Sequence, residues 1–274
     1  MAHVLALALQ QRSRQSQCVR PSPVPRAASS CVVTGARCSP KTPLMFLAAI
    51  TATSELGLKV LFLSPSPVPS LPGPVQEALA KLSPEALKKM QFRYPGSLEE
   101  LLHEVASLHE SPSRGASPPS LVILDRMEHY LRPGRDGMLQ QDRAAAAHIS
   151  ALLLDTAAFL TQKLEERGEA ALSCQVIVAF DPEWEGRTSG DLTTADPILT
   201  IVDRYFPLRC TLSQDERCAP LQAAAKTEEV WQICFSRLGV TTPCSTNTED
   251  SGLGQLWRLV VCQDGAMNFS VVSS

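Results

Sequence analysis

Apolar residues fall into short uninterrupted runs that alternate with amphipathic stretches along most of the chain. The apolar runs occupy 58–64, 91–94, 120–125 and 174–180, and proline or glycine follows several of them. Uninterrupted runs of this length are typical of strands buried on both faces of a sheet. Segments with helix-like patterns lie between them, at 44–56, 83–90, 97–109, 142–167 and 197–205. The alternation predicts an α/β fold with a mostly parallel sheet flanked by helices.

The C-terminal part of the chain has strand patterns without helices between them. These strands are expected at 208–212, 230–238, 256–262 and 266–272, and Asp264-Gly265 forms a turn before the last of them. Consecutive strands joined by polar links favour antiparallel pairing. We therefore predict that 213–274 extends the parallel core, 31–212, by an antiparallel meander within one domain, 31–274.

Residues 31–42, CVVTGARCSPKT, have the outline of a phosphate-binding loop, G-x-x-x-x-G-K-[ST], between a strand and a helix. Gly35, Lys41 and Thr42 match the motif, but Pro40 stands at the second glycine. That glycine lets backbone N–H groups converge on phosphate, whereas proline has no N–H to offer. The segment is either a degenerate nucleotide site or a coincidental match.

A second feature favours the nucleotide site. Asp125 ends the apolar run 121–124, where an acid in a phosphate-loop protein helps to hold Mg²⁺. Lys41 would contact the β- and γ-phosphates of ATP, and Thr42 would place its hydroxyl on the metal. Glu128 follows Asp125 closely; it could polarise a water, but we interpret it as a solvated loop acid.

The overall charge does not indicate a polyanionic partner. The formal net charge is −3 and the pI is near 6.0, so nucleic-acid binding would need a local basic patch. We expect no apolar run to reach membrane-spanning length, and therefore no membrane partner. Residues 1–30 are rich in Pro, Ser and Arg, and no acid precedes Glu55. This composition predicts a disordered basic segment, with a mitochondrial transit segment as the alternative.

Several segments together resemble a known family. The loop is followed by LKVLFLS, QFRYPGSLEELLHEVASLHE, SLVILDRMEHYL, AHISALLLDTAAFLTQKL and VDRYFP. In this order they are similar to the SWIM-type zinc-finger-associated ATPases, divergent RecA-like recombinase paralogues of Shu-type complexes. The resemblance implies a RecA-like P-loop NTPase core and a nuclear protein that supports homologous recombination. It also implies weak ATPase activity with ATP and Mg²⁺, single-stranded DNA binding, a SWIM-domain partner and other recombinase paralogues.

The site residues follow from matching the motifs of this family. Gly35, Lys41 and Thr42 correspond to its phosphate loop, and Asp125 to its magnesium-side acid. RecA-type enzymes also carry a glutamate after the second strand that activates water, and residues 64–67, SPSP, contain no carboxylate. Slow hydrolysis, or a non-enzymatic scaffold with an inactive nucleotide site, is therefore expected.

The DNA-binding loop of the family would fall at 181–196. Trp184 could stack on a base and Arg187 could contact phosphate. The loop also holds Glu183, Glu185 and Asp191, and this acid excess opposes contact with DNA phosphates. Both interpretations, a DNA-binding loop and an acidic loop without that role, stay open at this point.

Overall fold

The computed structural model describes residues 4–13, 30–36, 38–110, 117–131, 139–169, 173–182, 196–215, 228–237, 256–262 and 265–272. Within them, one nine-stranded sheet runs in the order β3-β2-β4-β5-β1-β6-β7-β8-β9. The strands are β1 Cys31–Gly35, β2 Val60–Leu63, β3 Met90–Arg93, β4 Leu121–Leu124, β5 Gln175–Phe180, β6 Leu208–Gln214, β7 Glu229–Arg237, β8 Leu256–Val261 and β9 Met267–Val272. The helices are α1 Val4–Ser13, α2 Lys41–Ser54, α3 Gly73–Ala80, α4 Pro84–Lys88, α5 Leu98–Ser107, α6 Leu139–Glu166 and α7 Pro197–Tyr205, with the 3₁₀ helix η1 Met127–Tyr130.

The sheet has the predicted organisation of a parallel core and an antiparallel extension. Strands β3, β2, β4, β5, β1 and β6 pair in parallel, and β6 to β9 pair antiparallel. Every residue of β1, β2, β4 and β5 is buried, whereas β7 to β9 alternate between buried and exposed positions over much of their length. The core strands are covered by helices on both faces, so their sequences show no alternation.

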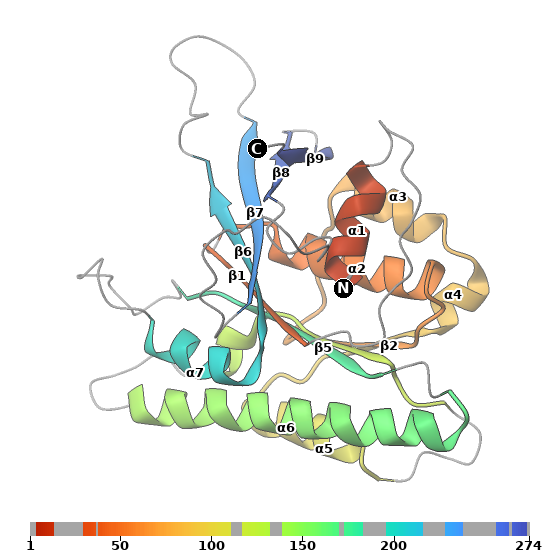
Figure 1. The fold of residues 1–274 in the computed structure, drawn as a ribbon, viewed down its shortest axis with the longest axis vertical. Coiled ribbons are helices and arrows are strands. Elements are labelled where there is room, and N and C mark those ends of the chain that lie inside the picture. The colour runs from red at the N-terminus through yellow and green to blue at the C-terminus, as the bar shows by residue number, and fades with distance from the viewer. Residues whose placement is uncertain are drawn as a thin grey trace, which may run out of the picture.

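Two layers of helices cover the sheet (Figure 1). Helices α1 and α2 pack on one face over a cluster that includes Phe62, Trp231 and Trp257. Helices α5, α6 and α7 cover the other face of the parallel strands, over a cluster that includes Val122, Val178 and Phe206. The C-terminal strands add residues only to the first cluster.

Helix α6 is the long helix expected at 142–167. It is long and apolar enough to cross a membrane, contrary to the expectation that no segment reaches that length. Its buried apolar side chains recur every three or four positions and belong to the cluster under the sheet: Ala146, Ile149, Leu153, Ala157 and Leu160. That spacing is the pattern of a core helix lying on a sheet.

Serine side chains cap two helices at the positions where helices 97–109 and 83–90 were expected to begin. Ser97 caps α5, its Oγ accepting a hydrogen bond from the Glu100 N–H at 3.1 Å. Ser83 caps α4 by accepting from the Ala86 N–H. The helix expected at 44–56 instead begins at Lys41, and its cap position at the C-terminal end is Glu55. Pro43 fits inside its first turn because N–H groups there have no intrahelical partner.

Two helices were not predicted. Helix α3 begins at Gly73, between Pro72 and Pro74, in a segment where no helix was expected. Helix α1 lies within 1–30, so the expectation of disorder is wrong for residues 4–13. Val4, Leu5 and Leu9 are buried there, and α1 contacts α2 and β9. Apolar contact with these two elements compensates for the entropy of ordering the segment.

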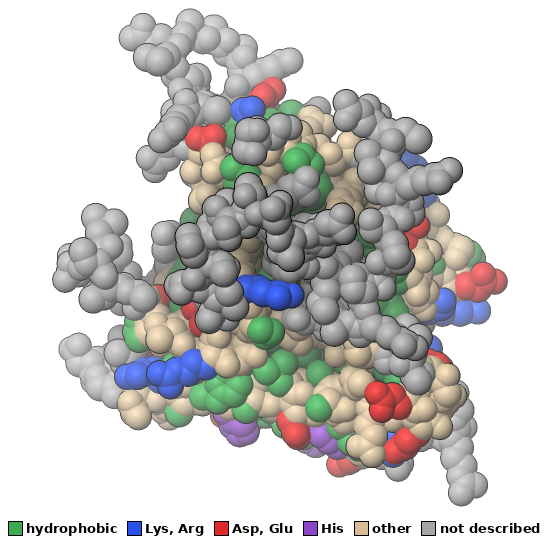
Figure 2. All heavy atoms as spheres, viewed as in Figure 1, with side chains coloured by type: hydrophobic (Ala, Val, Ile, Leu, Met, Phe, Trp, Pro, Cys, Tyr) green, Lys and Arg blue, Asp and Glu red, His purple; other side chains and the backbone are tan. Residues whose placement is uncertain are grey.

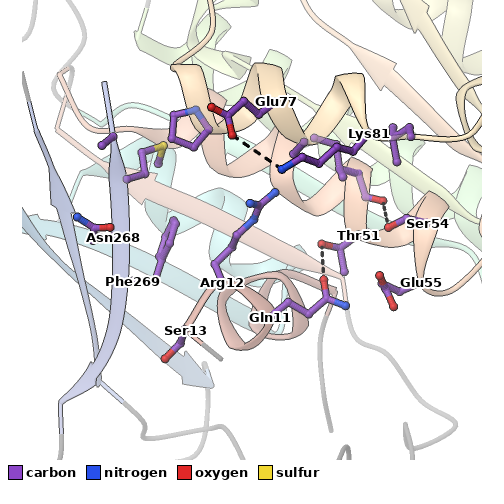
Figure 3. A pocket seen from close by; sticks show the side chains of 16 residues that line it. Gln11, Arg12, Ser13, Thr51, Ser54, Glu55, Glu77, Lys81, Asn268 and Phe269 are labelled. Carbon is purple, nitrogen blue, oxygen red and sulfur yellow. Dashed lines mark hydrogen bonds and ion pairs between the residues drawn. The ribbon is translucent and has the colours of Figure 1, made fainter. Parts of the chain in front are cut away.

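The end of α1 borders a cavity of about 850 Å³ between α1, α2, α3 and β9 (Figure 3). Gln11 and Arg12 from α1 lie opposite Glu77 and Lys81 from α3, and Phe269 of β9 closes one side. Burial lowers the pKa of Arg12, while the charge of Glu77 opposes this change. The cavity lies where α1 joins elements that are distant in the sequence.

Candidate nucleotide site

The phosphate-loop motif forms the turn between β1 and α2. The Ser39 N–H donates to the Ala36 carbonyl and the Lys41 N–H donates to the Ser39 carbonyl, both at 2.8 Å. Pro40 occupies the cap position of α2 and contributes no N–H. A Cβ on Gly35 would lie 2.6 Å from Ser39 Oγ and 3.0 Å from the Leu212 carbonyl oxygen, so this tight approach requires glycine.

The Lys41 side chain is buried and turned back into its own loop. Its Nζ donates to the carbonyl oxygens of Gly35 and Ala36 at 2.8 Å, and to Ser39 Oγ at 2.9 Å. The Oδ2 of Asp181, directly after β5, is 3.9 Å away. In this conformation the ammonium is held by oxygen atoms of the protein, where a phosphate-loop lysine would contact phosphate oxygens.

Asp125 lies directly against Thr42, although the two residues are 83 positions apart in the sequence. The Thr42 hydroxyl is 2.9 Å from Asp125 Oδ2 and 3.1 Å from Oδ1. Asp125 is fully buried, and burial raises its pKa, while the hydrogen bond from Thr42 and the charges of Arg126 and Lys41 oppose the rise. The predicted residues Gly35, Lys41, Thr42 and Asp125 thus meet at one edge of the sheet.

Glu128 also belongs to this site, which corrects its interpretation as a solvated acid. Its side chain is 9% exposed, and its Oε2 accepts a hydrogen bond from the Asp181 N–H at 3.0 Å. Burial raises the pKa of Glu128 to about 7, against the opposing effects of backbone hydrogen bonds and the charge of Lys41. No sequence motif marks Glu128; the 3₁₀ helix η1 buries it together with Met127 and Tyr130.

The residues that follow β2 lie beside Asp125, because Leu63 and Leu124 pair in register. No carboxylate occurs at this position, as the sequence indicated. The guanidinium of Arg126 lies there instead and donates to Ser64 Oγ at 2.9 Å. Arg126 was not predicted as a site residue, because the neighbouring sequence does not indicate its left-handed backbone conformation, with φ 55°.

The predicted DNA-contacting residues, Trp184 and Arg187, lie outside the described residues. On the face shown in Figure 2, the described Lys and Arg side chains occur in separate groups and form no continuous stripe.

The side chains at the site fit a magnesium–nucleotide complex. The Thr42 hydroxyl and the Asp125 carboxylate are oxygen ligands of the kind that Mg²⁺ prefers, and the charge of Lys41 acts on the same carboxylate. The loop itself has two N–H groups engaged in internal hydrogen bonds, so phosphate binding requires these bonds to be exchanged. The side chains therefore suit the ligand, and binding would require the loop to release these two N–H groups.

Solved structures with a similar fold include the RadB recombinase and a KaiC-like protein from the hyperthermophilic archaeon Pyrococcus horikoshii OT3. The RadB structure matches with a TM-score of 0.52 and 17% identity over 88% of this chain and 90% of that chain. The KaiC-like protein also gives a TM-score of 0.52, with 9% identity over 88% and 89% of the two chains. The chain therefore has a RecA-like α/β fold.

Two proteins of known name are similar to this chain in sequence and place it in a family within the RecA-like fold. The mouse protein ATPase SWSAP1 is 37% identical over 72% of this chain, and the alignment spans 63% of the mouse protein. The human ATPase SWSAP1 is 36% identical over 70% of this chain and 75% of the human protein. No protein-family profile matches the sequence. The chain belongs to the ATPase SWSAP1 family.

Proposed function

We propose that the chain is a nucleotide-binding subunit of a complex that supports homologous recombination. The observation that carries the proposal is the contact between Thr42 and Asp125 beside Lys41, at the start of α2. The membership in the ATPase SWSAP1 family and the RecA-like fold support the recombination role. ATP with Mg²⁺ is the proposed ligand, and the nucleus the proposed location.

Each residue has a defined role in nucleotide binding. Lys41 would exchange its loop carbonyls for phosphate oxygens, and the first N–H groups of α2 favour an anion at that end. Thr42 and Asp125 would hold the metal, which neutralises phosphate charge when bound. The absence of a carboxylate after Leu63 favours slow hydrolysis, because a missing general base typically costs a factor of about 10²–10⁴.

A direct test is equilibrium binding of a fluorescent ATP analogue with and without Mg²⁺. We expect wild-type protein to bind and Lys41→Ala to bind at least about tenfold more weakly, since a charge-assisted contact contributes about 1.5–3 kcal/mol. Lys88→Ala, exposed on α4, is the matched control and should bind as wild type does. Binding that survives Lys41→Ala would place the nucleotide elsewhere.

The family resemblance further supports a SWIM-domain zinc-finger partner, other recombinase paralogues and single-stranded DNA as partners. We expect affinity for an oligothymidine, measured by fluorescence anisotropy, to fall steeply with added salt. Each phosphate contact to a single strand contributes a slope of about −0.7 in log K against log salt concentration. A flat salt response would rule out phosphate contacts as the basis of binding.

A second candidate is a non-enzymatic scaffold of the same complex. Pro40 removes a cradle donor and Lys41 is already satisfied by oxygens of its own loop, and both observations favour this candidate. Wild-type protein that assembles with its partners but binds no ATP analogue would decide for the scaffold.

A further inference from the structure

Arg126 occupies the place beside Asp125 where a RecA-type enzyme would carry its water-activating carboxylate. Its Nη2 donates to the carbonyl oxygen of Ser66 at 2.9 Å and to the hydroxyls of Ser64 and Ser66 at 2.9 and 3.0 Å. Strands β2 and β4 bring these segments together, since the Asp125 N–H donates to the Leu63 carbonyl at 2.8 Å. A cation therefore stands at this position of the site.

The backbone of Arg126 is held in an unfavourable conformation. With φ 55° and ψ 53°, it is the one non-glycine residue with positive φ among the described parts of the chain. A left-handed residue other than glycine costs about 1–2 kcal/mol. The conformation turns the chain back immediately after Asp125, and the guanidinium Nε lies 3.6 Å from Asp125 Oδ2. Such strain is often found at ligand sites.

One donor of this guanidinium lacks an acceptor. The Nε of Arg126 is buried, and within the described residues it has no hydrogen-bond partner, because 3.6 Å to Asp125 is too long for one. A buried donor without an acceptor costs about 1–3 kcal/mol. The oxygens of a phosphate group are well suited to fill this need, since guanidinium groups bind them through paired N–H donors.

The position of the Arg126 guanidinium indicates which phosphate group of a nucleotide it would contact. Lys41 and Thr42 lie on the α2 side of Asp125, and Arg126 approaches the same carboxylate from the β2 side. We propose that Arg126 binds the terminal phosphate of a nucleoside triphosphate held at the phosphate loop, so that the site prefers triphosphate to diphosphate. This inference rests on the proposed nucleotide site and adds its specificity-determining residue.

The test compares affinities for non-hydrolysable fluorescent ATP and ADP analogues, both with Mg²⁺. Wild-type protein should prefer the triphosphate by about tenfold or more, the effect of one charge-assisted contact. Arg126→Ala should lose that preference while its affinity for the diphosphate stays within about twofold of wild type. Arg126→Lys, which keeps the charge but not the planar donor pair, should retain part of the preference.

Arg126→Gly separates binding from folding. Glycine adopts the left-handed backbone at low cost, so this variant should unfold at a higher temperature than Arg126→Ala and still lose the triphosphate preference. A purely structural role for Arg126 predicts instead that affinities for both analogues fall together, with an unchanged ratio. That result, or variants with the wild-type ratio, would overturn the inference. Wild-type protein that binds neither analogue would overturn the nucleotide site as well.

Discussion

Replacing Leu5 with aspartate is expected to lower the free energy of unfolding by about 4 kcal/mol, near the upper limit for one substitution. Leu5 is 1% exposed and belongs to the apolar cluster that α1 shares with α2 and β9. An aspartate there must either bring an unpaired carboxylate into this cluster or displace the helix and its apolar contacts. Urea denaturation followed by tryptophan fluorescence measures the loss, because Trp231 and Trp257 lie in the same cluster.

The matched control for Leu5→Asp is Gln10→Asp, which introduces the same charge on the same helix at a partly exposed position. It should change stability by less than about 1 kcal/mol. Limited proteolysis provides a second readout, since a displaced α1 would be cleaved sooner in Leu5→Asp than in wild type. Equal stability of Leu5→Asp and wild type would mean that α1 does not contribute to the folded core.

Replacing Glu128 with glutamine should stabilise the protein increasingly as the pH rises. Burial raises the pKa of Glu128 to about 7 from an ordinary value of 4.5, so the folded protein binds this proton more tightly than the unfolded chain does. Between these two values the unfolded state holds fewer protons, and the stability of wild type therefore falls as the pH rises. The advantage of Glu128→Gln should grow by about 2 kcal/mol from pH 5 to pH 8.

Urea denaturation at pH 5, 6, 7 and 8 measures this difference. Glutamine can still accept the hydrogen bond from the Asp181 N–H, so the local geometry is retained. Glu85→Gln, exposed on α4, serves as the control and should show no such trend. A constant difference between Glu128→Gln and wild type across the pH range would contradict a carboxyl group that titrates near neutrality in the folded state.

The parallel core was predictable because its strands have a sequence pattern that is hard to mistake. Runs such as 121–124 and 175–180 are apolar at every position, and buried strands between helices require this. The antiparallel extension was predictable from a different pattern. Strands β7 to β9 alternate between buried and exposed residues and follow one another without helices. Caps at Ser83 and Ser97 fixed two helix starts through local hydrogen bonds alone.

Helices α1 and α3 escaped prediction because their stability depends on distant contacts. The Arg- and Ser-rich composition of 1–30 indicated disorder, although residues 4–9 form a short apolar run. That run is stable as a helix because it packs on α2 and β9. In α3, Pro72 and Pro74 resemble loop residues, yet proline is well tolerated before and within a first helical turn.

The site was predictable where a motif specified it and missed where tertiary structure made it. Lys41, Thr42 and Asp125 followed from two short motifs that parallel strands bring to the same edge of the sheet. Glu128 and Arg126 follow no motif. Glu128 becomes part of the site because a 3₁₀ turn buries it. Arg126 becomes part of it because its backbone adopts a conformation that is rare outside glycine. DNA contacts at Trp184 and Arg187 stay predictions.

The order of strands in the sheet has a consequence for synthesis of the chain. Strand β1 precedes both of its sheet neighbours, β5 and β6, by a long stretch of sequence, and helix α1 rests partly on the distant strand β9. Strand β1 therefore lacks both of its sheet neighbours, and α1 lacks its contacts with β9, until the later strands have left the ribosome. The edges of the apolar strand β1 therefore stay unpaired for most of translation, a condition that favours chaperone binding before the sheet is complete.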